Sequence, residues 1–358
     1  MIGFNIKQLK SQIIVACSGI LILAVVVAAT GFRISSNYHA LATSCSNLNN
    51  CSLVLSSFSS QYGLLQTILN IIAIVMPVAF GMFWGSPIVA KEIESGTFRL
   101  AWTQSLSRNK WLSYKLAVVF ISGLISSIIV TVLISWWFRP FDIVNANMYE
   151  QQYYLVQDVV PVAYVIFAIS LGLFLGSIFK RNLPAIAATM VLYIVFILVM
   201  GSAIRPNLVS PTVGEYNLDN NTVVGFGSSN SGPLNLFLSA PDLPNSYIYS
   251  VVAVNDSGQA LSSQTVQSLC PDLFNLANSP PPISGPAARV GRVKKFFSQG
   301  DGSPLSNCIN AVSIKYHVKV TYLPESKFWP LQWTESGVLA LISLVLVALS
   351  FLRVNKLR

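Results

Sequence analysis

Charged residues are scarce in this sequence. Asp, Glu, Lys and Arg make up only 10% of its 358 residues, while 53% are hydrophobic; soluble domains carry roughly 25% charged residues. Several apolar runs of about 20 residues are long enough to cross a lipid bilayer as helices. The net charge of +9 does not indicate a nucleic-acid partner, because the basic residues lie at the ends of apolar runs. The composition therefore indicates a polytopic membrane protein.

Motifs for catalysis are also missing. No glycine is followed by lysine, which excludes a phosphate-binding P-loop, and neither a His-Glu-x-x-His pattern nor a Gly-x-Ser-x-Gly elbow occurs. The histidines, His39 and His317, fall in polar segments, and only Glu335 brings an acidic group near an apolar run, at its edge. We therefore expect no enzyme activity, no metal and no cofactor in this chain. A proton relay or ion-coupled transporter is disfavoured as well.

Six apolar runs predict six membrane-spanning helices, at residues 13–30, 64–83, 116–137, 159–178, 183–204 and 331–352. The polar segment before the last run alternates apolar and polar residues at 314–322 and, more weakly, at 247–254, which predicts strands. The predicted fold class is an all-α polytopic membrane protein with a small mixed α/β domain between helices five and six. Its expected divisions are 1–204 with the loop 84–115, the domain 205–330, and the sixth helix with its tail, 331–358.

The basic residues predict the orientation of these helices. The N-terminus, the loop 84–115, the turn at Lys180 and Arg181, and the C-terminus together hold twelve lysines and arginines, whereas the opposite short loops hold only Arg33 and Arg139. Basic loops stay on the cytoplasmic side. We therefore expect both termini inside the cell and the domain 205–330 outside.

The five cysteines fall into a single residue and two pairs. Cys17 lies inside the first apolar run, whereas Cys45 and Cys51 share a short loop and Cys270 and Cys308 share the long polar segment. If both loops face the outside, two disulfides are plausible there. Four free thiols are the alternative.

Residues 86–115 form the most informative stretch of the chain. Ser86 suits a helix cap, Pro87 the first helical position and Gly96 the residue after the end, so we predict a short helix at 87–95. The stretch also holds two acidic and five basic residues: Glu92, Glu94, Lys91, Arg99, Arg108, Lys110 and Lys115. We interpret it as the place where another protein pushes on the membrane part. An amphipathic loop lying on lipid is the simpler alternative.

The same stretch resembles the cytoplasmic loop of ABC-2-type permeases, the membrane subunits of ATP-binding-cassette exporters. The matching residues are Glu92, Glu94, Gly96, Thr97, Trp102, Thr103, Gln104, Ser105, Arg108, Trp111 and Lys115. The run from Phe328 to Glu335 is similar to the entry of the last span in one bacterial subgroup. Arg205 and Pro206 also fit that subgroup, although Asn207 stands where it has histidine.

The resemblance implies that the stretch is a coupling helix, which docks in a groove of an ATPase subunit. Two ATPase copies would bind ATP and Mg²⁺, and a second permease copy or a related permease would complete the pathway for a drug, peptide or lipid-like substrate. Glu92, Glu94 and Arg99 would then supply polar contacts, spans two and three would transmit the motion, and the groove would be filled by Ile88, Val89, Ile93, Phe98, Leu100 and Trp102.

Two questions stay open from the sequence. Polar residues inside the spans, such as Gln66, either line a pathway or form hydrogen bonds between neighbouring helices. Gly172 and Gly176 have the spacing of a close helix contact, although general helix packing also explains them. The alternative function is a ligand-binding membrane receptor or immunity protein that acts without transport.

Overall fold

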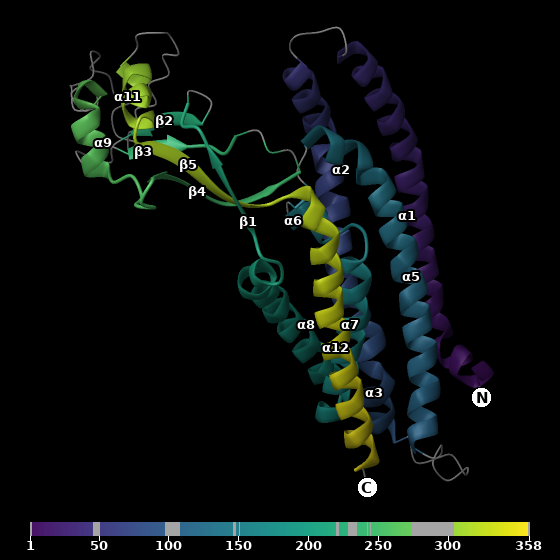
Figure 1. The fold of residues 1–358 in the computed structure, drawn as a ribbon. Helices are drawn as coiled ribbons and strands as arrows, with labels where there is room; N and C mark the ends of the chain where they lie inside the picture. Colours follow the sequence, from purple (N-terminus) through teal and green to yellow (C-terminus); the bar gives the residue numbers. More distant parts are fainter. Residues whose placement is uncertain are drawn as a thin grey trace, which may run out of the picture. The chain divides into compact units, whose positions relative to one another are not determined.

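The computed structural model describes residues 2–45, 51–96, 108–145, 148–149, 151–219, 222–227, 235–241, 243, 245–273 and 304–356. Within these ranges the fold is mostly helical, and six helices are long and apolar enough to cross a membrane (Figure 1). They are Cys17–Tyr38, Ser60–Ser95, Asn109–Phe141, Val160–Phe179, Asn182–Asn207 and Glu325–Asn355. Each of the six predicted spans overlaps one of these helices, which confirms the predicted number.

The chain divides into two compact units. The helical unit comprises Met1–Val209 and Ser326–Arg358, and the sheet unit comprises Ser210–Glu325. The helical unit contains α1 (Ile2–Cys45), α2 (Cys51–Phe80), η1 (Gly81–Gly85), α3 (Pro87–Ser95), α5 (Arg108–Asn145), α6 (Gln151–Tyr154), α7 (Val160–Phe179), α8 (Asn182–Val199), η2 (Met200–Ile204), η3 (Arg205–Asn207) and α12 (Phe328–Asn355).

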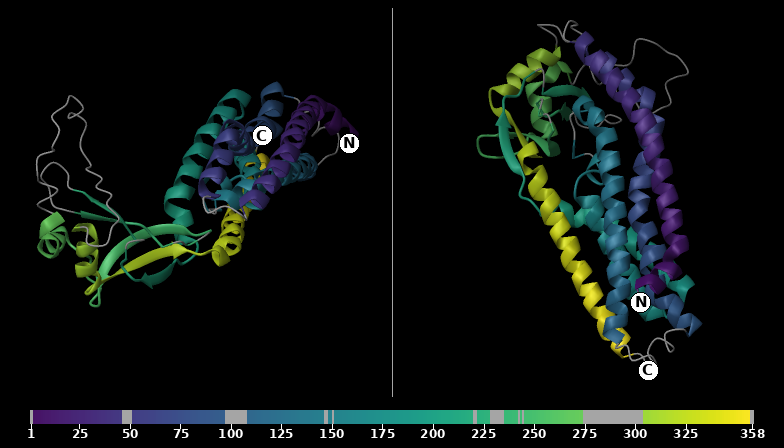
Figure 2. Two further views of the ribbon diagram at one scale, coloured as in Figure 1. Left: turned by 90° about the horizontal axis from the view of Figure 1, so that it is seen from above. Right: turned by 90° about the vertical axis from the view of Figure 1, so that its right-hand side faces the viewer.

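The central helix of this unit is α7. In its most apolar stretch 67% of the residues are buried, against 17% to 33% in the other spans. The helices α2, α5, α8 and α12 all pack against it, and Figure 2 shows α1 and α5 running side by side farther out. The start of α1, the end of α12 and α3 lie at the same end of the unit (Figure 1), which we call the α3 end.

The helix predicted at 87–95 exists with these bounds, but its start differs from the prediction. Ser86 has helical backbone angles and makes no capping hydrogen bond to α3. Because α2 continues through the π-helical turn η1 directly into α3, no free helix start exists at Ser86 and no cap is needed. The predicted end is confirmed. Gly96 adopts the left-handed conformation, at φ 71°, and its backbone N–H donates a hydrogen bond to the Ile93 carbonyl oxygen.

The sheet unit is a mixed structure, as predicted. It contains β1 (Thr212–Tyr216), β2 (Val223–Gly227), β3 (Asn235–Leu238), β4 (Tyr247–Asn255), β5 (Tyr316–Leu323), α9 (Ser263–Leu269) and α11 (Pro304–Ser313). The turn η5 (Glu325–Lys327) connects this unit to α12. Within the described residues, β1, β5 and β4 form an antiparallel sheet in that order, and β2 pairs with β3. Both predicted strands, now β5 and β4, are confirmed. The remaining three were missed because all are short, and β1 and β2 also carry glycines that break the pattern, at Gly214, Gly225 and Gly227.

The core of the sheet unit lies between the sheet and the two helices. Val318 and Val320 of β5 pack with Val266 of α9 and with Ile309 and Val312 of α11. A disulfide between Cys270 and Cys308 joins the end of α9 to the middle of α11, with Cα atoms 5.1 Å apart, so one predicted disulfide is present. The side chains of Cys45 and Cys51 lie outside the described part of the chain, and their pairing stays a prediction.

We expect the Cys270–Cys308 bridge to be a main support of the sheet unit. It closes a loop of 38 residues, and a bridge of that span stabilises a fold by about 2–4 kcal/mol. A Cys270→Ser, Cys308→Ser double variant should therefore unfold the sheet unit at lower denaturant concentration while the helical unit keeps its helix content. Circular dichroism and limited proteolysis distinguish the two units. Equal loss of both would show that the bridge supports more than its own unit.

Candidate functional site

The predicted coupling helix α3 is packed into the α3 end of the bundle. It lies against α7 and α8, and Val89 and Ala90 are fully buried. Ile88 and Val89 belong to a hydrophobic cluster that includes Trp84, Trp111 and Leu112, with Ile93 packed against it. The prediction that Ile88, Val89 and Ile93 fill a partner's groove is therefore wrong, because these side chains form the protein's own core.

A buried ion pair fixes α3 to α5. The Lys115 ammonium donates a hydrogen bond to a carboxylate oxygen of Glu92, and both residues are less than 10% exposed. The same ammonium lies 4.8 Å from the centre of the Trp111 ring, a cation–π contact from one helical turn earlier in α5. Glu92 was expected to be a polar contact for a partner, but the structure makes it an internal partner of Lys115.

Two polar contacts fix the same region to α8. The hydroxyls of Ser86 and Thr189 are hydrogen-bonded at 2.9 Å, and both residues are fully buried. A Glu94 carboxylate oxygen accepts a hydrogen bond from the Asn182 backbone N–H at 2.8 Å, at the first residue of α8. An acidic group at this position also complements the positive end of the helix dipole. The α3 segment thus continues α2 and is bound to α5, which are the predicted spans two and three, and it is also joined to α7 and α8.

Four glycines allow η1 and α7 to cross at backbone distance. A Cβ atom on Gly81 or Gly85 would lie 2.6 Å from a carbonyl oxygen of α7, and one on Gly172 or Gly176 would meet the backbone of Gly81 or Ser86. No side chain fits at this crossing. The spacing of Gly172 and Gly176 therefore marks a true close contact, and the crossing joins the base of α3 rigidly to the central helix.

The other predicted residues of the coupling stretch are only partly described. Trp111 is buried in the cluster above, and Gly96 ends α3. Arg108 is the first residue of α5, and its side chain lies outside the described residues. Thr97, Arg99, Trp102, Thr103 and Gln104 lie outside them entirely, as do Phe98 and Leu100. Of the described part, Lys91, Glu94 and Ser95 form the exposed side of α3.

A second polar cluster, which sequence reasoning missed, lies at the other end of the bundle. Glu335 of α12, which the sequence placed at the edge of an apolar run, is fully buried. Its carboxylate accepts two hydrogen bonds from Arg205, each 2.8 Å long, and one each from Tyr154 and Tyr164, at 2.9 and 2.8 Å. Burial, and then the Glu335 charge, raises the pKa of Tyr154, so its hydroxyl keeps the proton that it donates. One signal in the sequence pointed to this cluster. Arg205–Pro206 and the run from Phe328 to Glu335, which supply its two charged residues, both resemble one permease subgroup.

The polar residue Gln66 bonds a neighbouring segment. It donates a 2.6 Å hydrogen bond to the Tyr153 hydroxyl and so links α2 to α6.

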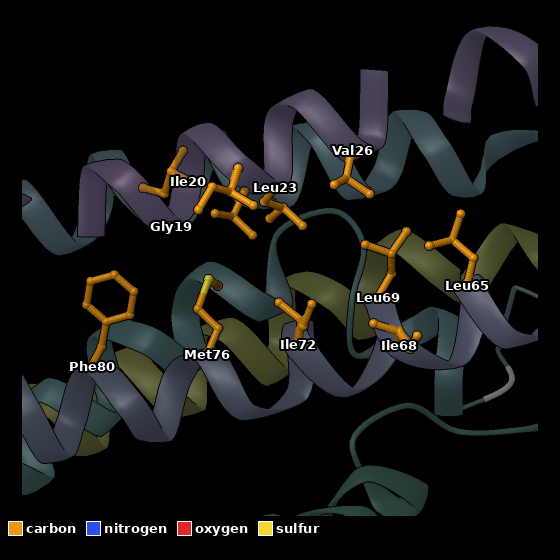
Figure 3. Close-up of a pocket in the computed structure, with 12 residues that line it drawn as sticks. Gly19, Ile20, Leu23, Val26, Leu65, Ile68, Leu69, Ile72, Met76 and Phe80 are labelled. Carbon is orange, nitrogen blue, oxygen red and sulfur yellow. The ribbon is translucent and has the colours of Figure 1, made fainter. Parts of the chain in front are cut away.

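A groove of about 430 Å³ opens between α1 and α2, and Figure 3 shows apolar side chains such as Leu23, Ile72 and Met76 lining it. No charged residue lines it, so it offers apolar contacts alone. Among the described residues, no group of three or more His, Cys, Asp or Glu side chains is placed to hold a metal ion.

In the described residues five long apolar helices accompany a buried central span, and the short helix α3 lies between the second and third, which indicates a multi-pass membrane protein. The chain belongs to the ABC-2 membrane transporter related family, whose model matches residues 17–205. It is thus an ABC-2-type permease, a group of proteins that generally works with an ABC ATPase partner. No curated protein and no solved structure matches the chain.

Proposed function

We propose that this chain is the permease subunit of an ABC exporter in the plasma membrane of a bacterium. A separate ATPase subunit would bind ATP and Mg²⁺ and drive the movement of a drug, peptide or lipid-like substrate. Two ATPase copies and a second permease, identical or related, would complete the transporter. The observation that carries this proposal is the attachment of α3: a short helix between two spans, held by α5, α7 and α8, with a charged outer side.

The burial of the apolar side of α3 supports a revised set of residues for contact with the ATPase. The outer side of α3 carries Lys91, Glu94 and Ser95, which follow each other at helical spacing. These residues, together with the segment 97–107 that follows them, are the proposed docking surface. Glu92 and Lys115 are buried and would not touch the ATPase themselves. Their ion pair sets the position of α3 on α5.

Orientation forms part of the proposal. The α3 end also carries the start of α1 and the end of α12 (Figure 1), so an ATPase at this end requires both termini inside the cell. The excess of basic residues in these same segments supports that orientation. The sheet unit is then connected to the helices on the outer side of the membrane.

Reversing the charge of Lys91 tests the docking surface. Lys91 is exposed on α3, so Lys91→Glu should leave the fold intact and weaken binding of the ATPase subunit at least tenfold, a change of about 1.4 kcal/mol. The measurement is co-purification with the ABC ATPase after co-expression, followed by titration of the purified subunits. Lys319→Glu, an equally exposed reversal in the sheet unit, is the matched control and should bind normally. Unchanged binding by Lys91→Glu would place the contact elsewhere.

A further inference from the structure

The Glu335 carboxylate is completely satisfied in a place where a charge is costly. A carboxylate offers about four acceptor positions, and the four hydrogen bonds from Arg205, Tyr154 and Tyr164 occupy them. Arg205 also lies over the ring of Tyr154, with its guanidinium carbon 4.6 Å from the ring centre. Apolar residues of similar size often replace a buried ion pair without loss of stability. The cluster is therefore better explained by holding particular segments together than by stabilising the fold in general.

The segments that it holds are the two connections to the sheet unit. Arg205 opens η3, and the chain then passes through residues 208–211 to β1. On the return path β5 ends at Leu323, and the chain passes through η5 into α12, where Glu335 lies two turns from the start. The ion pair thus joins the outgoing connection to the incoming one.

The same two connections are joined again inside the sheet unit. Thr212, the first residue of β1, is paired with Tyr322 near the end of β5. The chain segments from Arg205 to Thr212 and from Tyr322 to Glu335 therefore form the two sides of a closed ring. Strand pairing closes one end of the ring, and the ion pair closes the other.

A second set of contacts attaches this ring to the central helix. Gln332, one turn before Glu335, accepts a 3.0 Å hydrogen bond from the backbone N–H of Val160, the first residue of α7. Tyr164 contributes from the next turn of α7. Because α7 also carries the glycine crossing beneath α3, one helix contacts both the ring and the α3 end.

We propose that Arg205 and Glu335 form a latch, which keeps the two connections of the sheet unit closed and attached to α7. With the latch closed, the connections open only when the ion pair breaks. The proposal requires no ATPase partner, so its test is independent of the coupling proposal.

Hydrogen exchange measured by mass spectrometry on the purified full-length chain tests the latch. The Arg205→Met, Glu335→Leu double variant removes both charges together. We expect its unfolding temperature to fall modestly, because the Tyr154 and Tyr164 hydroxyls lose their acceptor. Amide exchange in residues 205–212 and 322–332 should rise at least tenfold and stay unchanged in α7 beyond its first turn. The Glu92→Leu, Lys115→Met double variant removes the buried pair at the opposite end and is the matched control. It should leave exchange in these two segments unchanged.

Two outcomes would overturn the latch. Unchanged exchange in the double variant would show that packing alone closes the connections. A general loss of protection across all six spans would show that the pair supports the whole bundle. Should the double variant fail to fold, Arg205→Lys keeps the charge and loses the two-pronged contact. It should then raise exchange in the same two segments several-fold, and a uniform rise or no rise would again contradict the latch.

Discussion

Gly172→Leu is expected to prevent assembly of the helical unit, whereas Gly337→Leu is expected to leave it intact. A Cβ atom at Gly172 would overlap the carbonyl oxygen of Gly81 and the backbone N of Ser86. Backbone cannot move aside as a flexible side chain does, so α7 and η1 would have to separate along their crossing. Overpacking a core with side-chain contacts costs about 1–3 kcal/mol. Because the clash here is with backbone, we expect an exceptional loss of more than about 4 kcal/mol.

Gly337 is the matched control because it is also a glycine within a membrane helix. It lies on the exposed side of α12, and nothing approaches within 4 Å of a Cβ placed there. Leucine is the better helix former by somewhat less than about 1 kcal/mol, and its side chain suits a lipid-facing position. Fluorescence-detected size-exclusion chromatography with thermal challenge should show normal protein for Gly337→Leu and aggregated or absent protein for Gly172→Leu. A stable, monodisperse Gly172→Leu variant would contradict the close crossing.

The parts of the fold that depend on local sequence were predictable. An apolar run of sufficient length fixes a span wherever its partners lie, so the number of spans followed from the sequence. The end of α3 was equally local, since Gly96 can adopt the left-handed conformation in which it is found. The paired cysteines of the sheet unit also indicated their bridge.

The contacts of the candidate site were not predictable because they join distant segments. The apolar side of α3 could face a partner or the protein itself, and only the packing of Val89 against the bundle decides this. Lys115 follows Glu92 by 23 residues, and Glu335 follows Arg205 by 130. The sequence placed Glu335 at the edge of an apolar run and showed nothing of its partners, whereas Tyr154, Tyr164 and Arg205 enclose it in the structure. No local pattern contains that information.

The ion pair between Glu92 and Lys115 leads to the second large effect. Glu92→Leu alone would leave the Lys115 ammonium buried without its counter-charge, and breaking a buried pair in this way costs about 3–5 kcal/mol. Lys115→Met alone would leave the Glu92 carboxylate unpaired at a similar cost. The Glu92→Leu, Lys115→Met double variant removes both charges and should recover to within about 1 kcal/mol of the original stability, because well-packed apolar residues replace buried pairs without penalty. Denaturant unfolding of the purified protein in detergent measures all three variants.

The double-mutant cycle separates the pair from its surroundings. If the pair acts as inferred, the two single losses are strongly non-additive, since each removes the same interaction. Lys91→Met is the control on the exposed side of the same helix, where a lost charge should cost less than about 0.5 kcal/mol. Additive losses in the double variant would show that Glu92 and Lys115 support α3 separately. The double variant also tests what the ion pair contributes to coupling. If the pair only positions α3, the double variant should still bind the ATPase subunit. Lost binding in a stable double variant would show that the two charges take a direct part in docking.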